Sequence, residues 1–344
     1  MFAVAAGWFA WKALVTPYKG FEGDEIIVEI ERGWTSERIM QTLREKGVLR
    51  DEYVPLAYLK LFHSDDFLKA GHYRFEGQAR PVDIVMTLLE GKTLLSSVTI
   101  REGLDRFEIA RIMSDAGFGS TDQWERATSD PTLILDLAPE ADSLEGYLFP
   151  DTYLIAPGST AQSIVEQMVS NFRSNFGDEL AYIDTDLSVH ETVTLASIVE
   201  TEARLAEERA LIAGVYLNRV QKGMLLQADP TVIYALKLRD DWDGNIKKSD
   251  LKIESPYNTY RNRGLPPGPI ANPGLASLQA ASRPARTEFL YFVSRNDGSH
   301  VFARNLREHN RNVHEYQRLY WREKRRQEAE EARSKGPTPA EQAE

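Results

Sequence analysis

The sequence contains no cysteine, which excludes several kinds of site. Without cysteine there is no disulfide, no thiolate ligand for zinc and no cysteine nucleophile, whatever compartment the protein works in. The HExxH pattern of many zinc hydrolases is also missing, and His309 and His314 do not lie at the helical spacing of metal ligands. We therefore expect neither a metal ion nor a cofactor.

An excess of positive charge is missing as well. The 344 residues carry a formal net charge of -11. Because proteins that bind DNA or RNA concentrate Lys and Arg on one surface, this charge argues against nucleic acid as a partner. A neutral or mixed-charge substrate fits better. The length suits two folded parts with appendages, and a hydrophobic share of 42% allows each part a core.

Long hydrophobic runs are absent, although a short one opens the chain. Residues 1–15 are almost wholly apolar, with a single charge at Lys12. Since a membrane-spanning helix needs about 20 apolar residues, we interpret residues 1–17 as a transmembrane anchor without its beginning. Acidic residues follow, among them Glu22, so the Lys and Arg excess of a cytoplasmic flank is missing. We expect a single-pass protein of the inner membrane whose body lies on the periplasmic side. A buried amphipathic helix is the alternative.

A unit of strand, glycine turn and helix occurs twice with the same spacing, and more weakly a third time over residues 73–91. We expect residues 22–119 to form a small α+β module similar to the LysM-like fold, which is known for binding glycan. A structural βα unit without a ligand is the alternative. The matching positions are Val28, Gly33, Ile39, Leu43 and Gly47 in one copy and Val98, Gly103, Ile109, Met113 and Gly117 in the other.

Residues 120–321 predict a second, larger domain that is rich in helix and is also α+β. Apolar residues three and four apart predict helices over 160–176, 190–204 and 207–222. The Asn296-Asp297-Gly298 segment between two short apolar runs predicts a β-hairpin. From residue 322 the chain becomes strongly charged, and we expect residues 322–344 to form a disordered tail.

The predicted helix over 190–204 offers the first candidate for chemistry. It is apolar on all faces from Val193 to Val199 and then carries Glu200. Partial desolvation there should raise the pKa of the carboxyl group, which suits a proton donor near neutral pH. The alternative is a structural Glu200 that pairs with Arg204. Glu202 lies above the same apolar residues, so helical periodicity alone does not choose between the two carboxylates.

A loop rich in proline and glycine, residues 255–274, offers the second candidate. Prolines restrict such a loop while glycines permit its turns, so it is expected to hold one shape. Tyr257 and Tyr260 are suited to stacking on sugar rings, and Asn258 and Asn272 to bonding sugar hydroxyls and amides. A purely structural loop that caps a sheet is the alternative.

A third segment, residues 227–231, lies just before a predicted helix over 232–238. Asp229 and Thr231 are suited to capping that helix, and we expect capping to be their main role.

Four segments resemble, in order, motifs of the YceG-like family of endolytic murein transglycosylases. The resemblance extends to about Tyr320 and implies that Glu200, within Ile-Val-Glu, is the catalytic residue. The segments are Glu145-Gly-Tyr-Leu-Phe-Pro150, Leu195-Ala-Ser-Ile-Val-Glu-Thr-Glu-Ala203, Leu226-Gln-Ala-Asp-Pro-Thr-Val-Ile-Tyr234, and Tyr257-Asn-Thr-Tyr260 with Gly264-Leu-Pro-Pro-Gly268. The candidate substrate-binding residues are Glu145, Tyr147, Glu202, Asn218, Gln227, Asp229, Thr231, Tyr257, Asn258, Thr259, Tyr260 and Asn272.

The resemblance also implies a reaction. One glutamic acid protonates the glycosidic oxygen between N-acetylmuramic acid and N-acetylglucosamine, and the C6 hydroxyl of the muramic acid then closes onto C1. The product is a 1,6-anhydro end, and cleavage would limit the length of nascent strands, beside the cell-wall synthesis machinery. A hydrolase with Glu202 or Asp229 as second carboxylate, which leaves reducing ends, and a non-catalytic peptidoglycan-binding scaffold are the alternatives.

Overall fold

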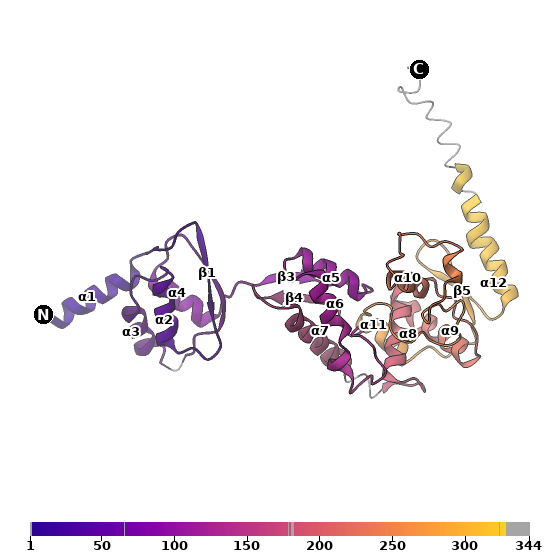
Figure 1. The fold of residues 1–344 in the computed structure, drawn as a ribbon, viewed down its shortest axis with the longest axis horizontal. Helices are drawn as coiled ribbons and strands as arrows, with labels where there is room; N and C mark the ends of the chain where they lie inside the picture. The colour runs from indigo at the N-terminus through magenta and orange to yellow at the C-terminus, as the bar shows by residue number, and fades with distance from the viewer. Residues whose placement is uncertain (1, 65, 178, 180–181, 323, 328–344) are drawn as a thin grey trace, which may run out of the picture. The chain divides into compact units, whose positions relative to one another are not determined.

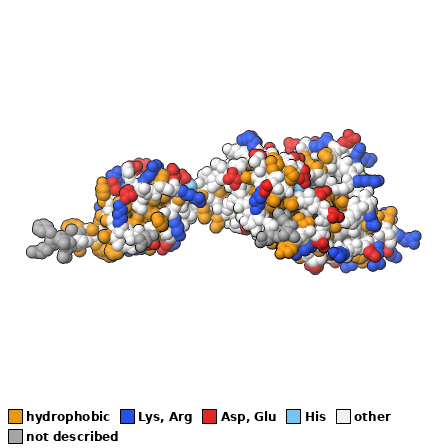
Figure 2. Space-filling model, turned by 90° about the horizontal axis from the view of Figure 1, so that it is seen from below, with side chains coloured by type: hydrophobic (Ala, Val, Ile, Leu, Met, Phe, Trp, Pro, Cys, Tyr) orange, Lys and Arg blue, Asp and Glu red, His pale blue; other side chains and the backbone are white. Residues whose placement is uncertain are grey.

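The computed structural model describes residues 2–64, 66–177, 179, 182–322 and 324–327. The chain forms two compact units (Figure 1). The first contains residues 1–98 and 152–159, and the second contains residues 99–151 and 160–344. Helices and two-stranded sheets occur in both units, so the predicted α+β fold class is confirmed. On the face drawn in Figure 2, basic side chains are scattered among acidic ones, as the mixed composition leads one to expect.

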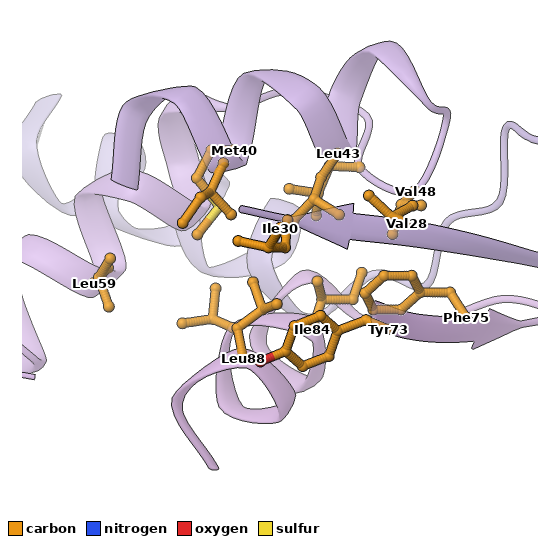
Figure 3. Close-up of a cluster of buried hydrophobic side chains, with 13 residues drawn as sticks. Val28, Ile30, Met40, Leu43, Val48, Leu59, Tyr73, Phe75, Ile84 and Leu88 are labelled. Atoms are coloured by element: carbon orange, nitrogen blue, oxygen red, sulfur yellow. The ribbon is translucent and has the colours of Figure 1, made fainter. Parts of the chain in front are cut away.

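The first unit packs helices on an antiparallel pair of strands. Buried and exposed side chains alternate along β1, where Val28 and Ile30 are buried and Ile27 is exposed. Val28 lies opposite Tyr73 of β2. Figure 3 shows Met40 and Leu43 of α2 in the same hydrophobic cluster. The elements are α1 (Phe2–Val15), β1 (Glu25–Ile30), α2 (Ser36–Glu45), α3 (Tyr53–Phe62), β2 (Gly71–Glu76), α4 (Pro81–Glu90), β3 (Ser96–Thr99, which ends at the boundary) and β4 (Thr152–Ile155), with β3 paired to β4.

The N-terminal helix α1 has 14 residues. Trp8, Phe9 and Trp11 are exposed on it, whereas Leu14 near its end is buried. Within the described part of the chain, no helix combines the length and the apolar character needed to cross a bilayer.

The predicted repeat is present as a succession of strand, glycine, helix and glycine. Gly33 and Gly103, which follow β1 and β3, have φ values of 86° and 79°, a backbone region that glycine enters without strain. The weaker third copy has the same order through β2 and α4. The division into units falls at Val98, so the helix of the second clear copy belongs to the second unit.

The second unit is mainly helical, and its predicted helices match α7, α8 and α9 to within two residues. The predicted hairpin is present as β5 and β6, with Asn296 and Gly298 at positive φ. Residues 322 and 324–327 continue the last helix, and the rest of the predicted tail lies outside the described residues. The elements are α5 (Arg106–Asp115), α6 (Thr121–Ser129), η1 (Pro131–Ile134), α7 (Ala161–Phe176), α8 (Val189–Glu202), η3 (Ala206–Glu208), α9 (Arg209–Gln221), α10 (Asp229–Lys237), η4 (Asp250–Lys252), α11 (Leu275–Ser282), β5 (Tyr291–Ser294), β6 (His300–Ala303), α12 (Leu306–Val313) and the π-helical η5 (His314–Leu319).

Candidate active site

Helix α8 runs through the centre of the second unit and presents its last turn at the site. It begins with a capping box, in which Ser188 accepts from the backbone N–H of Glu191 and the Glu191 carboxylate accepts from the N–H of Ser188. All residues from Thr192 to Val199 are buried. The helix is therefore held on every side before its acidic end emerges.

The proline- and glycine-rich loop is bound to α8 at two points. The hydroxyl of Ser197 accepts from the backbone N–H of Ile270 at 3.0 Å. Nε2 of His190 donates to the carbonyl of Pro267 at 3.0 Å, and the Tyr147 hydroxyl lies 2.9 Å from Nδ1 of the same ring. The loop therefore has one shape, as its composition predicts.

Most of the predicted substrate-binding side chains are framework residues in the structure. The polar side-chain groups of most of them bond within the protein: Asn258 donates to the carbonyls of Leu251 and Ile253, and Asn218 donates to those of Thr287 and Phe289. This use of their polar groups favours a structural role over the expected contact with glycan. The framework set is Glu145, Tyr147, Asn218, Thr231, Tyr257, Asn258, Thr259 and Asn272, of which all but the half-buried Asn218 are buried.

Asn272 and Glu145 form the centre of this framework. The side chain of Asn272 accepts from the N–H groups of Gly146 and Leu148, and it donates to the Leu104 carbonyl and, at 2.8 Å, to Glu145. Burial, and after it the charge of Asp105, raises the pKa of Glu145 to about 8. The loop and the segment around Glu145 are thereby joined in one buried network.

Glu200, the catalytic residue expected from the sequence, is directed at the start of helix α11. Its Oε2 accepts from the N–H of Gly274 at 3.0 Å, and its Oε1 lies 3.5 Å from Nη2 of Arg209. The cation near Glu200 is thus Arg209 and not the Arg204 considered from the sequence. The side chain is 6% exposed, and a carboxylate at a helix N-terminus is stabilising.

Glu102 approaches the same helix start, and sequence reasoning missed it. A Cβ atom added to Gly274 would lie 1.8 Å from Glu102 Oε1, so the carboxylate packs directly on that glycine. Burial, and then the charge of Glu200, raises the pKa of Glu102. Nothing in the local sequence pattern indicates this approach, because it joins segments that are far apart in the chain.

Glu202 faces the other way and borders open space. At about 100° per residue, two residues along a helix are separated by about 200°, so Glu200 and Glu202 lie on nearly opposite sides of α8. The Tyr216 hydroxyl donates to Glu202 Oε1 at 3.1 Å, and within the described part of the chain Oε2 has no hydrogen-bond partner. Burial, opposed by the Tyr216 hydrogen bond and supported by the charge of Asp229, raises the pKa of Glu202 to about 7.

Two cavities meet at Glu202. The first, here called the Tyr260 cavity, has a volume of about 360 Å³ and is lined by Gln227, Asp229 and Tyr260, three further residues expected from the sequence. The second, the Trp321 cavity, has a volume of about 480 Å³. Glu202, Ser294 and His300 line both, and Glu200 lines neither. Each volume is in the range of small-ligand sites.

The rest of the wall of the Tyr260 cavity includes residues that the sequence did not single out, among them Tyr216, Arg219 and Phe292. Arg219 donates to the carbonyls of Leu290 and Leu226 and lies 4.9 Å from the centre of the Tyr291 ring. The hairpin was predicted, but not that Phe292 of its first strand packs on Tyr216 of α9 and lines a cavity beside Glu202. No group of three or more His, Asp or Glu side chains within the described residues is arranged to hold a metal ion.

The backbone at Gln227 is also unusual. Its φ of 52° is left-handed, a region that residues other than glycine rarely adopt. The Tyr260 hydroxyl donates to Asp229 across the same wall. Local strain of this kind is often found where a side chain must point into a site.

Known proteins resemble this chain over most of its length. Residues 28–315 match the YceG-like family. An endolytic murein transglycosylase of Bacillus subtilis is 33% identical, with 89% of this chain and 88% of that protein covered. One from Streptococcus pneumoniae is 31% identical, with 91% of this chain and 62% of that protein covered. The crystal structure of a YceG-like protein from Listeria monocytogenes has a TM-score of 0.57 at 34% identity, covering 84% of this chain and 98% of the other.

Proposed function

The chain belongs to the YceG-like family, and on that premise we propose that it cleaves peptidoglycan glycan strands internally, as a lytic transglycosylase with Glu202 as its general acid. The observation that carries the choice of residue is the place of Glu202 at the junction of the two cavities. An endolytic enzyme needs space for sugars on both sides of the bond it breaks. Glu202 borders two such spaces.

The proposed reaction uses one carboxyl group twice. Protonated Glu202 donates its proton to the glycosidic oxygen, and the bond from that oxygen to C1 of the muramic acid breaks. The C6 hydroxyl of the same sugar bonds to C1 and transfers its proton to the Glu202 carboxylate, which restores the acid. A pKa of about 7 suits both steps near neutral pH. Because the nucleophile is part of the reacting sugar, no second carboxylate is required.

The neighbours of Glu202 have defined parts in this proposal. The Tyr216 hydroxyl holds Oε1, which leaves Oε2 for the proton transfer. Asp229 lines the Tyr260 cavity, where a negative charge would stabilise positive charge that develops at C1. Gln227 and Tyr260 supply an amide and an aromatic face for the sugar.

Two matched variants test the choice of acid. We expect Glu202→Gln to fold and to lose activity on purified sacculi by a factor of about 100 or more, because the amide cannot donate the proton. Glu200→Gln keeps an oxygen for the Gly274 N–H and should retain most of the activity. If Glu200→Gln is inactive and Glu202→Gln is active, the sequence-based prediction of Glu200 stands and ours fails.

Mass spectrometry of the digest tests the reaction type. We expect 1,6-anhydro ends. Reducing ends would instead indicate a hydrolase in which Asp229 acts with Glu202. Binding to sacculi without soluble product would indicate a scaffold.

The first unit and α1 have proposed roles that support the second unit. We assign the first unit to glycan binding as a LysM-like module, because its strand–helix units resemble that fold. The exposed Trp8, Phe9 and Trp11 suit a membrane interface, so we assign α1 to tethering at the periplasmic face of the inner membrane, where cleavage would limit strand length beside the synthesis machinery. If α1 is a tether, the protein should stay in the membrane fraction after a carbonate wash. If cleavage limits strand length, cells without the protein should have longer glycan strands.

A further inference from the structure

The Trp321 cavity lies where a substrate held at Glu202 must extend. It shares Glu202, Ser294 and His300 with the Tyr260 cavity. A glycan strand that crosses the acid therefore places a neighbouring sugar, or a substituent of the reacting sugar, in this second space.

The outer wall of the Trp321 cavity is attached to the hairpin. In η5, Gln317 donates to the Ser294 carbonyl at 2.7 Å, and Asn296 donates to the carbonyl of Tyr316 at 2.6 Å. The π-helical turn interrupts the regular helix immediately before Tyr320 and Trp321, and such turns are frequent at functional sites. The aromatic pair is thus positioned by the fold at the side of the cavity.

The chemistry of this wall differs from that of the Tyr260 cavity. Tyr320 and Trp321 are 38% and 42% exposed. Arg204 and Lys324 also line the space, both are exposed, and within the described residues neither forms an ion pair. Lys324 lies 5.0 Å from the centre of the Trp321 ring. Among the described residues that line this space, Glu202 is the only one with a carboxylate.

The arginine of the Tyr260 cavity, by contrast, is already engaged. Arg219 is bound to backbone carbonyls, and Asp229 adds a negative charge to that lining. Two unpaired cations beside exposed aromatic rings, on one side of the acid only, indicate a ligand that is anionic and partly apolar on that side.

Resting on the proposed function, we propose that the Trp321 cavity binds the carboxylate-bearing substituent of a muramyl residue. In peptidoglycan that carboxylate belongs either to the stem peptide or, where the peptide has been removed, to the lactyl group. Arg204 and Lys324 bind the carboxylate, and Trp321 packs on the apolar part of the substituent. The cavity thereby selects a muramyl-containing strand over an unsubstituted glucosamine polymer.

The test compares Arg204→Gln/Lys324→Gln with the wild-type chain on three forms of the same glycan strands. One form carries stem peptides, one has been stripped by an amidase and retains free lactyl carboxylates, and one has been amidated so that no carboxylate remains. Lys222→Gln/Lys248→Gln removes the same charge from exposed sites outside both cavities and is the matched control.

We expect the variant to lose about fivefold in kcat/KM on at least one carboxylate-bearing form, the size of effect that two exposed charge contacts produce, and nothing on the amidated form. If kcat/KM falls only on the peptide-bearing form, the bound carboxylate belongs to the stem peptide. If kcat/KM falls on the stripped form, the bound carboxylate belongs to the lactyl group. Equal loss on all three forms, or no loss on any, overturns the inference. So does an unchanged rate combined with weaker binding to anionic vesicles, which would make this a lipid contact.

The proposed function is judged separately by Glu202→Gln. If that variant is inactive while Arg204→Gln/Lys324→Gln behaves as wild type on every strand, the acid stands and the recognition site does not.

Discussion

The Tyr216 hydroxyl lies 3.1 Å from Oε1 of Glu202 and donates to it, which joins the middle of α9 to the end of α8. This bond orients one carboxylate oxygen and opposes the effect of burial on the pKa of Glu202. The hydroxyl of Tyr216 thus affects both the orientation and the pKa of the proposed acid.

Tyr216→Phe should therefore slow the reaction and shift its pH dependence. Losing a hydrogen bond to a group that carries charge typically costs about 1.5–3 kcal/mol, so kcat/KM should fall at least about tenfold. Because the hydrogen bond lowers the pKa of Glu202, its removal moves the alkaline limb of the pH–rate profile to higher pH. Tyr182→Phe, at an exposed site, is the control and should change neither quantity.

Asp229→Asn should shift the same limb in the opposite direction. The negative charge of Asp229 contributes to the raised pKa of Glu202, after burial. Without that charge the acid loses its proton at lower pH, and the activity at neutral pH falls. The measurement is kcat/KM from pH 5 to pH 9 (about two units on either side of 7), with Asp186→Asn as control. A shift to higher pH would contradict the electrostatic coupling.

Glu145→Gln should make stability less dependent on pH. The folded pKa of about 8 lies above the unfolded value of about 4.3, so the folded state binds the extra proton between these limits. Wild-type stability should therefore fall as pH rises through this window. The free energy of unfolding of the variant, relative to that of the wild type, should therefore increase by about 3–4 kcal/mol as the pH is raised from 5 to 8. Urea unfolding at both pH values measures this, and a constant difference would mean that Glu145 is ionised throughout.

Asn272→Ala should destabilise the second unit without touching the cavities. It leaves the N–H groups of Gly146 and Leu148 without their acceptor and removes one of the hydrogen bonds to the Glu145 carboxyl group. An unsatisfied buried group costs about 1–3 kcal/mol, so the two N–H groups alone should reduce the free energy of unfolding by at least about 2 kcal/mol, measured by denaturant unfolding. Asn175→Ala is the control, because its side chain is exposed and donates to the carbonyl of Asn171 in its own helix.

Helices, turns and the repeat could be predicted because they depend on neighbours in the sequence. Ser188 and Glu191 form their capping box within one turn, and the glycines at 33 and 103 permit positive φ whatever surrounds them. The rigidity of the proline-rich loop follows from its own residues in the same way. Asn272 was recognised as important from that loop, but its partners are more than a hundred residues away.

The amino-acid sequence by itself determined that α8 ends in two carboxylates after a largely apolar stretch, and that the chain carries the family's motifs. Only the tertiary structure decided which carboxylate meets which surroundings. Gly274 and Arg209 approach the side of Glu200, whereas the hairpin and Tyr216 leave open space beside Glu202. Helical spacing places side chains around an axis, but long-range packing decides which side of that axis is filled.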